Sequence, residues 1–163
     1  MGFVNLSFAL NTKIHLPHVK MEFSRITPGI YLGTNQCCQV HYQLELIERG
    51  VTHDISLEGE HVDEPYGADS YLWLPTEDHQ APSLTALKMG VAYIEQILRF
   101  GGQVYVHCKN GHGRSPTLVA AWFISRGKTL AQAIALIKRK RPEIHLEKSQ
   151  IAALKQFSVA VLD

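Results

Sequence analysis

The stretch from Val104 to Thr117 constrains the fold of this chain more than any other part of the sequence. It begins with an apolar run, Val104-Tyr105-Val106, whose β-branched and aromatic side chains are typical of a buried strand. Glycines then interrupt the pattern, and a mostly apolar segment follows them. We expect Ser115 to cap a helix there and Pro116 to lie in its first turn, where a proline is tolerated. The stretch therefore predicts a strand, a glycine loop and a helix in succession.

A loop that ends at a helix N-terminus can bind a tetrahedral anion. Backbone N–H groups point into such a loop, and the helix dipole adds positive potential. Arg114, at the end of the loop, carries a planar fork of donors that can hold two phosphate oxygens at once. Cys108, at the start of the loop, would lie beneath the anion, where the same donors would stabilise a thiolate. The stretch therefore predicts a sulfur nucleophile placed for in-line attack on a bound phosphoryl group.

This region resembles the HCxxGxxRS signature of cysteine-dependent protein phosphatases, in the compact dual-specificity branch: His107-Cys108-Lys109-Asn110-Gly111-His112-Gly113-Arg114-Ser115. The resemblance implies a phosphocysteine intermediate on Cys108 and phosphoryl binding by Arg114. It also implies that Ser115 helps the thiolate to leave again and that His107 supports the thiolate from behind the loop. The remaining residues of the phosphate-binding loop, or P-loop, are then Lys109, Asn110, Gly111, His112 and Gly113.

A thiolate can displace a phosphoester productively only if the leaving oxygen receives a proton, which requires a general acid close above the pocket. The dual-specificity family places an Asp on the loop that precedes the long helix. Here the resemblance implies Asp78, on the loop from Pro75 to Pro82. Other residues with suitable side chains remain alternatives: Glu77, His79, Asp63 and Glu64.

The rest of the chain alternates between strand and helix patterns. We expect strands at these further places: residues 25–27, 30–32, 51–57 and 71–74. We expect helices in these further segments: residues 34–50, 83–100, 129–141 and 151–161. Such alternation calls for an α/β fold with a sheet covered on both faces. We therefore predict one domain over residues 23–163, with a central, mostly parallel, twisted sheet of four to five strands flanked by helices, and an N-terminal arm over residues 1–22.

Two of these segments carry more specific expectations. The helix that starts at Thr34-Asn35 should end at Gly50 and bury its apolar positions, which are Cys37, Val40, Leu44 and Ile47. The strand over residues 51–57 should bury one face, formed by Val51, His53, Ile55 and Leu57, with His53 as a core or edge histidine.

Composition and charge exclude several other classes of protein. The chain has 163 residues with a net charge of +1, so no global field favours nucleic acid or a stable membrane association. We expect a monomer. Three cysteines, an odd number, favour a reducing compartment, and we expect a cytoplasmic protein. Cys37 and Cys38 read as structural, and whether either pairs with Cys108 stays open. The nine histidines show no ligand spacing with cysteine, so we expect neither a metal nor any other cofactor.

The substrate is less constrained than the chemistry. A chain of this length resembles the branch with a shallow pocket, which admits phosphoserine and phosphothreonine as well as phosphotyrosine on a protein or peptide. Lys109 and His112 would add positive charge to the pocket, and a lysine after the cysteine also occurs in relatives that act on phospholipids. A phosphoinositide or phosphatidylglycerophosphate phosphatase is therefore an alternative, and a catalytically silent phosphate-binding module is another.

Two features near the C-terminus bear on the same site. A basic cluster, Lys138-Arg139-Lys140-Arg141, compensates a helix dipole or forms a docking patch for a second phosphate or an acidic peptide. The resemblance implies that the segment from Arg141 to Gln150 packs near the P-loop, with Gln150 as a packing or loop-supporting residue.

Overall fold

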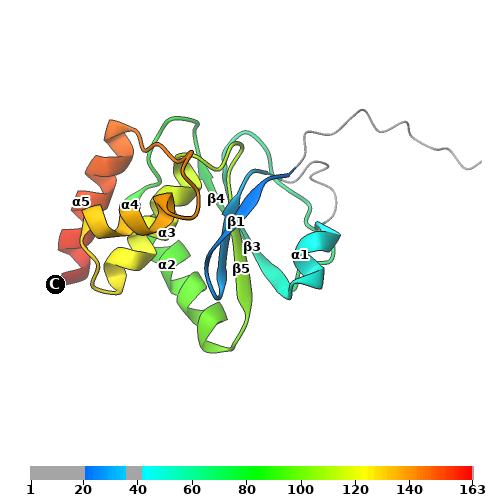
Figure 1. Ribbon diagram of the computed structural model, residues 1–163. Coiled ribbons are helices and arrows are strands. Elements are labelled where there is room, and N and C mark those ends of the chain that lie inside the picture. The colour runs from blue at the N-terminus through cyan, green and yellow to red at the C-terminus, as the bar shows by residue number, and fades with distance from the viewer. Residues whose placement is uncertain (1–20, 36–41, 163) are drawn as a thin grey trace, which may run out of the picture.

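The structure, a computed structural model, describes residues 21–35 and 42–162 (Figure 1). Its centre is a five-stranded sheet in the order β1-β2-β5-β3-β4. The strands are β1 (Phe23–Thr27), β2 (Ile30–Gly33), β3 (Val51–Glu58), β4 (Ser70–Thr76) and β5 (Gln103–His107). Only β1 and β2 pair in antiparallel fashion, and the other neighbouring pairs are parallel. The predicted single-domain α/β fold with a mostly parallel sheet is confirmed.

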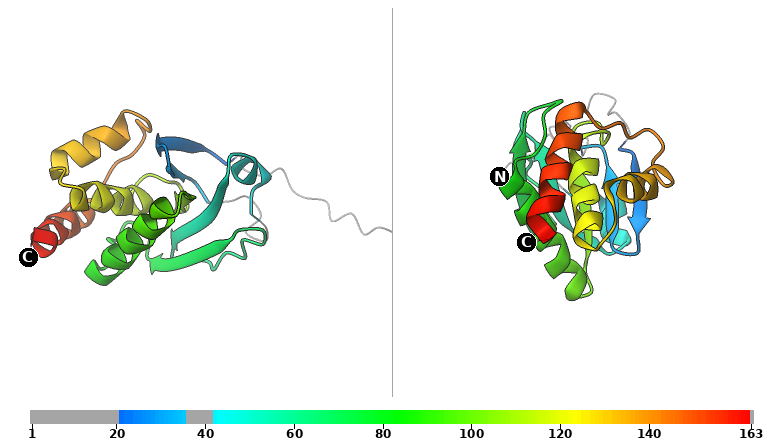
Figure 2. Two further views of the ribbon diagram at one scale, coloured as in Figure 1. Left: turned by 90° about the horizontal axis from the view of Figure 1, so that it is seen from below. Right: turned by 90° about the vertical axis from the view of Figure 1, so that its left-hand side faces the viewer.

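Helices cover both faces of the sheet, as Figures 1 and 2 show. They are α1 (Leu44–Glu48), α2 (Leu84–Arg99), α3 (Arg114–Ser125), α4 (Leu130–Lys138) and α5 (Lys148–Leu162). Helices α2 to α5 lie on one side, with α3 between the sheet and the outer helices, whereas α1 lies on the opposite side. The main core lies between the sheet and α2 to α5, and a smaller one lies under α1.

Local capping bonds start helices α2 and α4. The Ser83 hydroxyl accepts a hydrogen bond from the backbone N–H of Ala86 at the start of α2. Thr129 and Gln132 form both hydrogen bonds of a capping box at the start of α4. These local bonds satisfy N–H groups that would otherwise have no partner, which is why short sequence signals predict them well.

Strand β3 differs from the prediction in which residues share a face: Ile55 and Leu57 lie in the main core, but Val51 lies in the smaller one, because the register shifts between Val51 and His53. Both faces of the strand are buried. It lies between β5 and β4, and α1 and the segment after β3 cover the side that the sequence pattern leaves polar. The polar side chains of Asp54, Ser56 and Glu58 are therefore buried together with the expected apolar ones. His53 is half-buried and its Nδ1 lies 2.7 Å from the Ser70 hydroxyl, in agreement with a structural histidine.

Helix α1 is shorter than predicted. It begins at Leu44 after the N-cap residue Gln43, whose side chain makes no capping bond. The predicted inward positions Cys37 and Val40 lie outside the described residues. Leu44 is 64 % exposed, whereas its neighbour Leu46 is fully buried. The prediction that Leu44 faces inward is therefore wrong. The sequence pattern placed the start of the helix too early, and this shifted the predicted inward face. Gly50, with a φ of 75°, follows the helix as expected.

Helix α3, unlike α1, begins earlier than predicted. Its N-cap is Gly113 rather than Ser115, and Arg114 is the first helical residue. Ser115 is therefore inside the helix, where its hydroxyl faces Cys108 instead of capping the helix. Pro116 does lie in the first turn, where its missing N–H costs no helical hydrogen bond.

Strand β4 extends beyond its predicted end, through Pro75 to Thr76. It is an edge strand, where a proline with no N–H to donate is tolerated. Helix α4, in contrast, ends at Lys138, so Arg141 falls in the connection to α5.

Candidate active site

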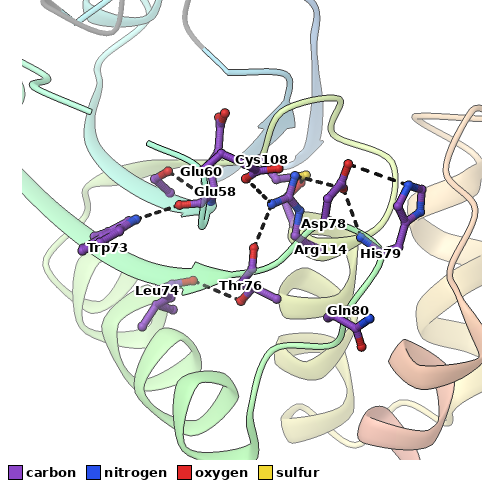
Figure 3. Close-up of polar contacts among 12 residues, drawn as sticks. Glu58, Glu60, Trp73, Leu74, Thr76, Asp78, His79, Gln80, Cys108 and Arg114 are labelled. Atoms are coloured by element: carbon purple, nitrogen blue, oxygen red, sulfur yellow. Dashed lines mark hydrogen bonds and ion pairs between the residues drawn. The ribbon is translucent and has the colours of Figure 1, made fainter. Parts of the chain in front are cut away.

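A small cavity of about 50 Å³ opens where the P-loop joins β5 to α3. This is the edge at which the parallel strands β3, β4 and β5 end, the usual place for a ligand site in an α/β sheet. The cavity is lined by Asp78, His79, Cys108, Asn110, His112, Gly113, Arg114, His145, Glu147 and Gln150. The fold therefore brings Asp78, Cys108 and Arg114 to one cavity (Figure 3), as the sequence predicted.

Four carbonyl groups of the P-loop, those of residues 109 to 112, bond to groups outside the loop. The Lys109 carbonyl accepts a bond from the Asn35 N–H at 3.3 Å, and the His112 carbonyl accepts one from the His145 N–H at 3.0 Å. Arg141 donates to the remaining two, from Nη2 to Asn110 at 3.3 Å and from Nε to Gly111 at 3.1 Å. In a planar trans peptide the N–H points opposite to the C=O. The N–H groups that follow these carbonyls are therefore directed into the loop.

Gly111 is required by this loop conformation. Its φ of 65° lies in the left-handed region, and a Cβ there would collide with the backbone carbonyl of Gly33. At Gly113 a side chain would meet Gln150 at 2.9 Å. The glycines thus let the loop pass close to β2 on one side and to α5 on the other.

Cys108 lies at the bottom of the cavity and is 2 % exposed. Its Sγ lies 3.2 Å from the hydroxyl oxygen of Ser115, which is fully buried. A hydroxyl at this distance can donate a hydrogen bond to a sulfur anion. The sulfur is therefore surrounded by donors: the Ser115 hydroxyl, the loop amides and the N-terminus of α3.

The guanidinium of Arg114 contacts residues at the ends of two strands, β3 and β4 (Figure 3). Nη1 donates to Glu60 at 2.7 Å and to the Thr76 carbonyl at 2.8 Å, and Nη2 lies 3.1 Å from Asp78 Oδ1. Burial opposes the positive charge, but the hydrogen bond with Glu60 and the negative charges of Cys108, Glu60 and Asp78 outweigh it and raise the pKa of Arg114. The same hydrogen bond lowers the pKa of Glu60. The sequence analysis assigned no role to Glu60.

Asp78 lies on a loop that the C-terminal segment holds in place. The backbone N–H of His79 donates to Asp78 Oδ1 at 3.1 Å, and His79 adopts a left-handed φ of 61°. The His79 carbonyl accepts a bond from the Ser149 hydroxyl at 3.3 Å, and the Gln80 carbonyl accepts one from Gln150 at 3.0 Å. Gln150 is 1 % exposed, and its position agrees with the predicted loop-supporting role.

The alternatives to Asp78 are placed differently. Glu77 and Glu64 are exposed, and neither lines the cavity. His79 lines the cavity but is also turned toward Glu147, with Nδ1 and Oε1 3.2 Å apart. Asp63 is 4 % exposed and lies beside His107, behind the P-loop.

His107 lies behind the P-loop, as predicted, and is fully buried. Its Nε2 lies 3.4 Å from Asp54 Oδ1 and 3.5 Å from Asp63 Oδ2, and its ring stacks on Tyr105 with centroids 5.3 Å apart. Burial opposes the imidazolium form, but Asp54 and then Asp63 outweigh it and raise the pKa of His107. Neither carboxylate was predicted as a partner of this histidine.

The positive charge expected at the rim is weaker than the sequence suggested. Lys109 is exposed and does not line the cavity. The ring of His112 lies 5.3 Å from that of His145. Burial, and then Arg141 and His145, lower the pKa of His112. His112 is therefore mainly neutral near pH 7.

The basic cluster divides into two parts. Lys138, Arg139 and Lys140 are exposed at the end of α4, whereas Arg141 is 2 % exposed and holds the P-loop. Only the exposed part remains available as a docking patch.

Residues 21–35 and 42–162 contain neither a metal-binding group of side chains nor a membrane-spanning helix. No group of three or more His, Cys, Asp or Glu side chains there is arranged to hold a metal ion. None of the helices in that part of the chain is both long and apolar enough to span a bilayer.

Comparison with known proteins identifies the family. Residues 30–160 match the family described as dual specificity phosphatase, catalytic domain. Mouse laforin is 29 % identical over 164 aligned positions, which cover 85 % of this chain and 50 % of laforin. The phosphatidylglycerophosphate phosphatase PTPMT2 of Arabidopsis thaliana is 36 % identical over 90 positions, covering 54 % of this chain and 40 % of that protein. This chain therefore belongs to the dual specificity phosphatase family.

A solved structure supports the same assignment. The crystal structure of PTPMT1 in complex with PI(5)P superimposes with a TM-score of 0.77 at 25 % identity, covering 86 % of this chain and 96 % of that one. The curated relatives are longer, since the chain spans half of laforin and 40 % of PTPMT2.

Proposed function

We propose that this protein is a cysteine-dependent phosphomonoester hydrolase that acts on phosphoproteins, on phosphotyrosine and also on phosphoserine and phosphothreonine. The observation that carries the proposal is the convergence of Cys108, Arg114 and Asp78 on one cavity beneath inward-directed amides. Membership of the dual specificity phosphatase family supports the same chemistry.

In the first step, the Cys108 sulfur attacks phosphorus as the bond from phosphorus to the ester oxygen breaks. The loop amides and the fork of Arg114 hold the phosphoryl oxygens. The phosphoryl group replaces Asp78 at Nη2 of Arg114, and Asp78, released and protonated, gives its proton to the leaving oxygen.

In the second step, a water molecule attacks the phosphocysteine and gives a proton to the Asp78 carboxylate. The S–P bond breaks, and the Ser115 hydroxyl donates a hydrogen bond to the departing thiolate, 3.2 Å away in the resting site. His107 supports this thiolate from behind the loop. Positive charge from Arg114 and the amides replaces what a metal would otherwise supply, so the reaction needs no cofactor.

The charges around the cavity favour a peptide over a lipid headgroup with several phosphates. Asp78 and Glu147 line the cavity, Glu60 occupies one side of Arg114, and His112 has a lowered pKa. A polyanionic headgroup would meet these carboxylates with little compensating positive charge. The lipid alternative rests on Lys109 and on the likeness to PTPMT2, named as a phosphatidylglycerophosphate phosphatase.

The decisive experiment compares turnover of phosphotyrosyl and phosphoseryl peptides with turnover of phosphatidylglycerophosphate and PI(5)P in vesicles. We expect kcat/KM to be higher for the peptides, with Cys108→Ser inactive on every substrate and Arg114→Lys nearly inactive. Faster turnover in vesicles would assign the lipid function. Phosphopeptide binding by the wild type with no hydrolysis of any substrate would assign a silent binding module.

The role of Asp78 has a test of its own. We expect Asp78→Asn to slow hydrolysis of phosphopeptides far more than hydrolysis of a nitrophenyl phosphate, whose leaving group scarcely needs a proton. Glu77→Gln is the matched control, because it removes an exposed carboxylate from the adjacent position. Equal losses on both substrates would place the acid elsewhere.

We also propose that the catalytic unit, residues 23–163, works as a monomer without stable membrane association. We place it in the reducing environment of the cytoplasm, because Cys108 must stay reduced to act. Size-exclusion chromatography with light scattering, and fractionation of cells, test these points.

A further inference from the structure

A group of buried polar side chains lies behind the P-loop, and the two carboxylates in it take no part in the steps above. It consists of Asp54 on β3, Asp63 in the segment after β3, and His107 at the end of β5. The exposed fractions of these three residues are 0 %, 4 % and 0 %. Both carboxylates face the same imidazole nitrogen, at 3.4 and 3.5 Å from Nε2.

Burial of these carboxylates is unfavourable for folding, so we looked to their surroundings for a function. Position 54 pairs with Tyr105 in the parallel register of β3 and β5, where an apolar side chain would be expected in a strand buried on both faces. Burying a carboxylate in such a place costs several kcal/mol unless it is paired. The carboxylates converge on the residue that directly precedes Cys108, and this suggests that their charge acts on the sulfur.

We propose that Asp54 and Asp63 are positioning residues that hold His107 as an imidazolium, whose positive charge stabilises the Cys108 thiolate from beneath the P-loop. The inference deepens the proposed function and rests on it, because a stabilised thiolate matters only if Cys108 is the nucleophile.

The charges around His107 agree with this. The carboxylates raise the pKa of His107 against the effect of burial. Burial raises the pKa of Asp54, but Asp63 supplies a second carboxylate at the same nitrogen. A proton on Nε2 is attracted to both carboxylates, and their charge also favours a second proton on Nδ1, a buried atom with no hydrogen-bond partner among the described residues.

The other titratable groups that face this cluster do not compete for the role. Burial and the charges of Asp63 and Glu60 raise the pKa of Glu58. Burial raises the pKa of Tyr71 to about 12 and also raises that of Tyr105, so both hydroxyls stay neutral at pH 7. The charge on His107 is therefore governed by Asp54, Asp63 and the sulfur itself.

The test measures the reactivity of Cys108 rather than turnover. The full chain is alkylated with iodoacetamide across a range of pH, and mass spectrometry of the peptide that contains Cys108 gives its rate separately from those of Cys37 and Cys38. The pH at half-maximal rate reports the thiolate directly. We expect Asp54→Asn and Asp63→Asn each to raise the midpoint by about one pH unit, which lowers the alkylation rate about tenfold at pH values well below the midpoint.

Two controls separate this effect from a general change in charge or packing. Glu64→Gln removes an exposed carboxylate next to Asp63 and should leave the alkylation profile unchanged. In a His107→Gln background, Asp54→Asn should have no further effect, because the carboxylate acts through the imidazole. An unchanged profile in both Asp variants, or an equal shift with and without His107, would overturn the proposal.

A measurement on the wild-type protein needs no variant to fold. Nitrogen chemical shifts of the His107 imidazole should show protons on both ring nitrogens at pH 7, and a neutral ring would overturn the proposal. Both readouts are independent of any substrate. A wild type that hydrolyses no phosphoester but keeps a protonated His107 and a reactive Cys108 would reject the proposed function alone.

Discussion

Replacing Arg141 by Met should weaken both the fold and the catalytic site. Arg141 is 2 % exposed and donates two hydrogen bonds to consecutive carbonyl groups of the P-loop, those of Asn110 and Gly111. Methionine fills a similar space but donates nothing, so the variant leaves both carbonyls without their partner.

The size of the effect follows from these two bonds. A hydrogen bond from a charged donor contributes about 1.5–3 kcal/mol, so the pair contributes about 3–6 kcal/mol. Removing a buried guanidinium also removes its cost of desolvation, which offsets part of that loss. We therefore expect Arg141→Met to lower the free energy of unfolding by about 3 kcal/mol. The carbonyls would then be free to turn inward, and we expect kcat/KM to fall about a hundredfold or more.

Urea denaturation followed by circular dichroism gives the stability, and hydrolysis of a phosphotyrosyl peptide gives kcat/KM. Arg139→Met is the matched control, because Arg139 lies two positions away at the end of α4 with an exposed side chain. Its stability should change by less than about 0.5 kcal/mol. If Arg141→Met cost less than about 1 kcal/mol and kept full activity, the P-loop would be held by something other than Arg141.

Three further variants test separate features. Gly111→Ala should lower stability by more than about 2 kcal/mol, because it adds a collision with Gly33 to the strain of a left-handed φ. Gly101 has a φ of 77° and open space around it, so Gly101→Ala should be destabilised by the backbone strain alone. Equal losses of stability in urea would disprove the collision. Thr129→Ala should cost about 1 kcal/mol by removing the cap of α4, and no change in the urea midpoint would contradict this. Glu60 has a lowered pKa, so its stabilising effect is present above the ordinary glutamate pKa and is lost as the pH falls through the lowered one. The stability difference between wild type and Glu60→Gln should therefore vanish at low pH, and it should stay below about 1 kcal/mol because the carboxylate is one-third exposed; a difference that grew on acidification would refute the assignment.

The P-loop could be predicted from sequence because its geometry is encoded locally. Cys108, the glycines and Arg114 follow one another within a single strand–loop–helix unit, so their residue types alone bring them together. Asp78 required a resemblance to a known family, since nothing near Pro75 distinguishes it from Glu77 or His79. The structure distinguishes them: of these three residues, Asp78 is the one that contacts Arg114.

The buried polar face of β3 could not be predicted from the sequence pattern. A period of two correctly placed Ile55 and Leu57 on one face, but it was wrong for Val51, which lies in the smaller core because the register shifts between Val51 and His53. The pattern also says nothing about what covers the opposite side. Burial of Asp54 results from α1 and from the segment that carries Asp63, both brought there by tertiary packing. Polar side chains on one face of a strand usually indicate exposure to water, and here that inference is wrong.

The position of Ser115 shows how a local rule can identify a residue and miss its task. A serine directly before a proline is a good helix cap, but the helix starts at Arg114 because Gly113 takes the N-cap position. The hydroxyl is consequently available to Cys108, 3.2 Å away. A cap and a thiolate donor need the same side chain near the same helix start, and only the packing of the loop decides between them.

The guanidinium of Arg114 gives the two acidic loops different tasks. Glu60 follows β3 and Asp78 follows the neighbouring β4, so the parallel sheet brings one carboxylate from each loop to opposite ends of the same fork. Nη1 is also bound by the Thr76 carbonyl, which makes the Glu60 side the better anchored one. Asp78 contacts the guanidinium at Nη2, lines the cavity and has a side chain that is 42 % exposed, so it is the carboxylate that an incoming phosphoryl group can displace from Arg114 at least cost. We infer that Glu60 fixes the orientation of Arg114 while Asp78 is left free to exchange protons, a division that neither loop's sequence encodes by itself.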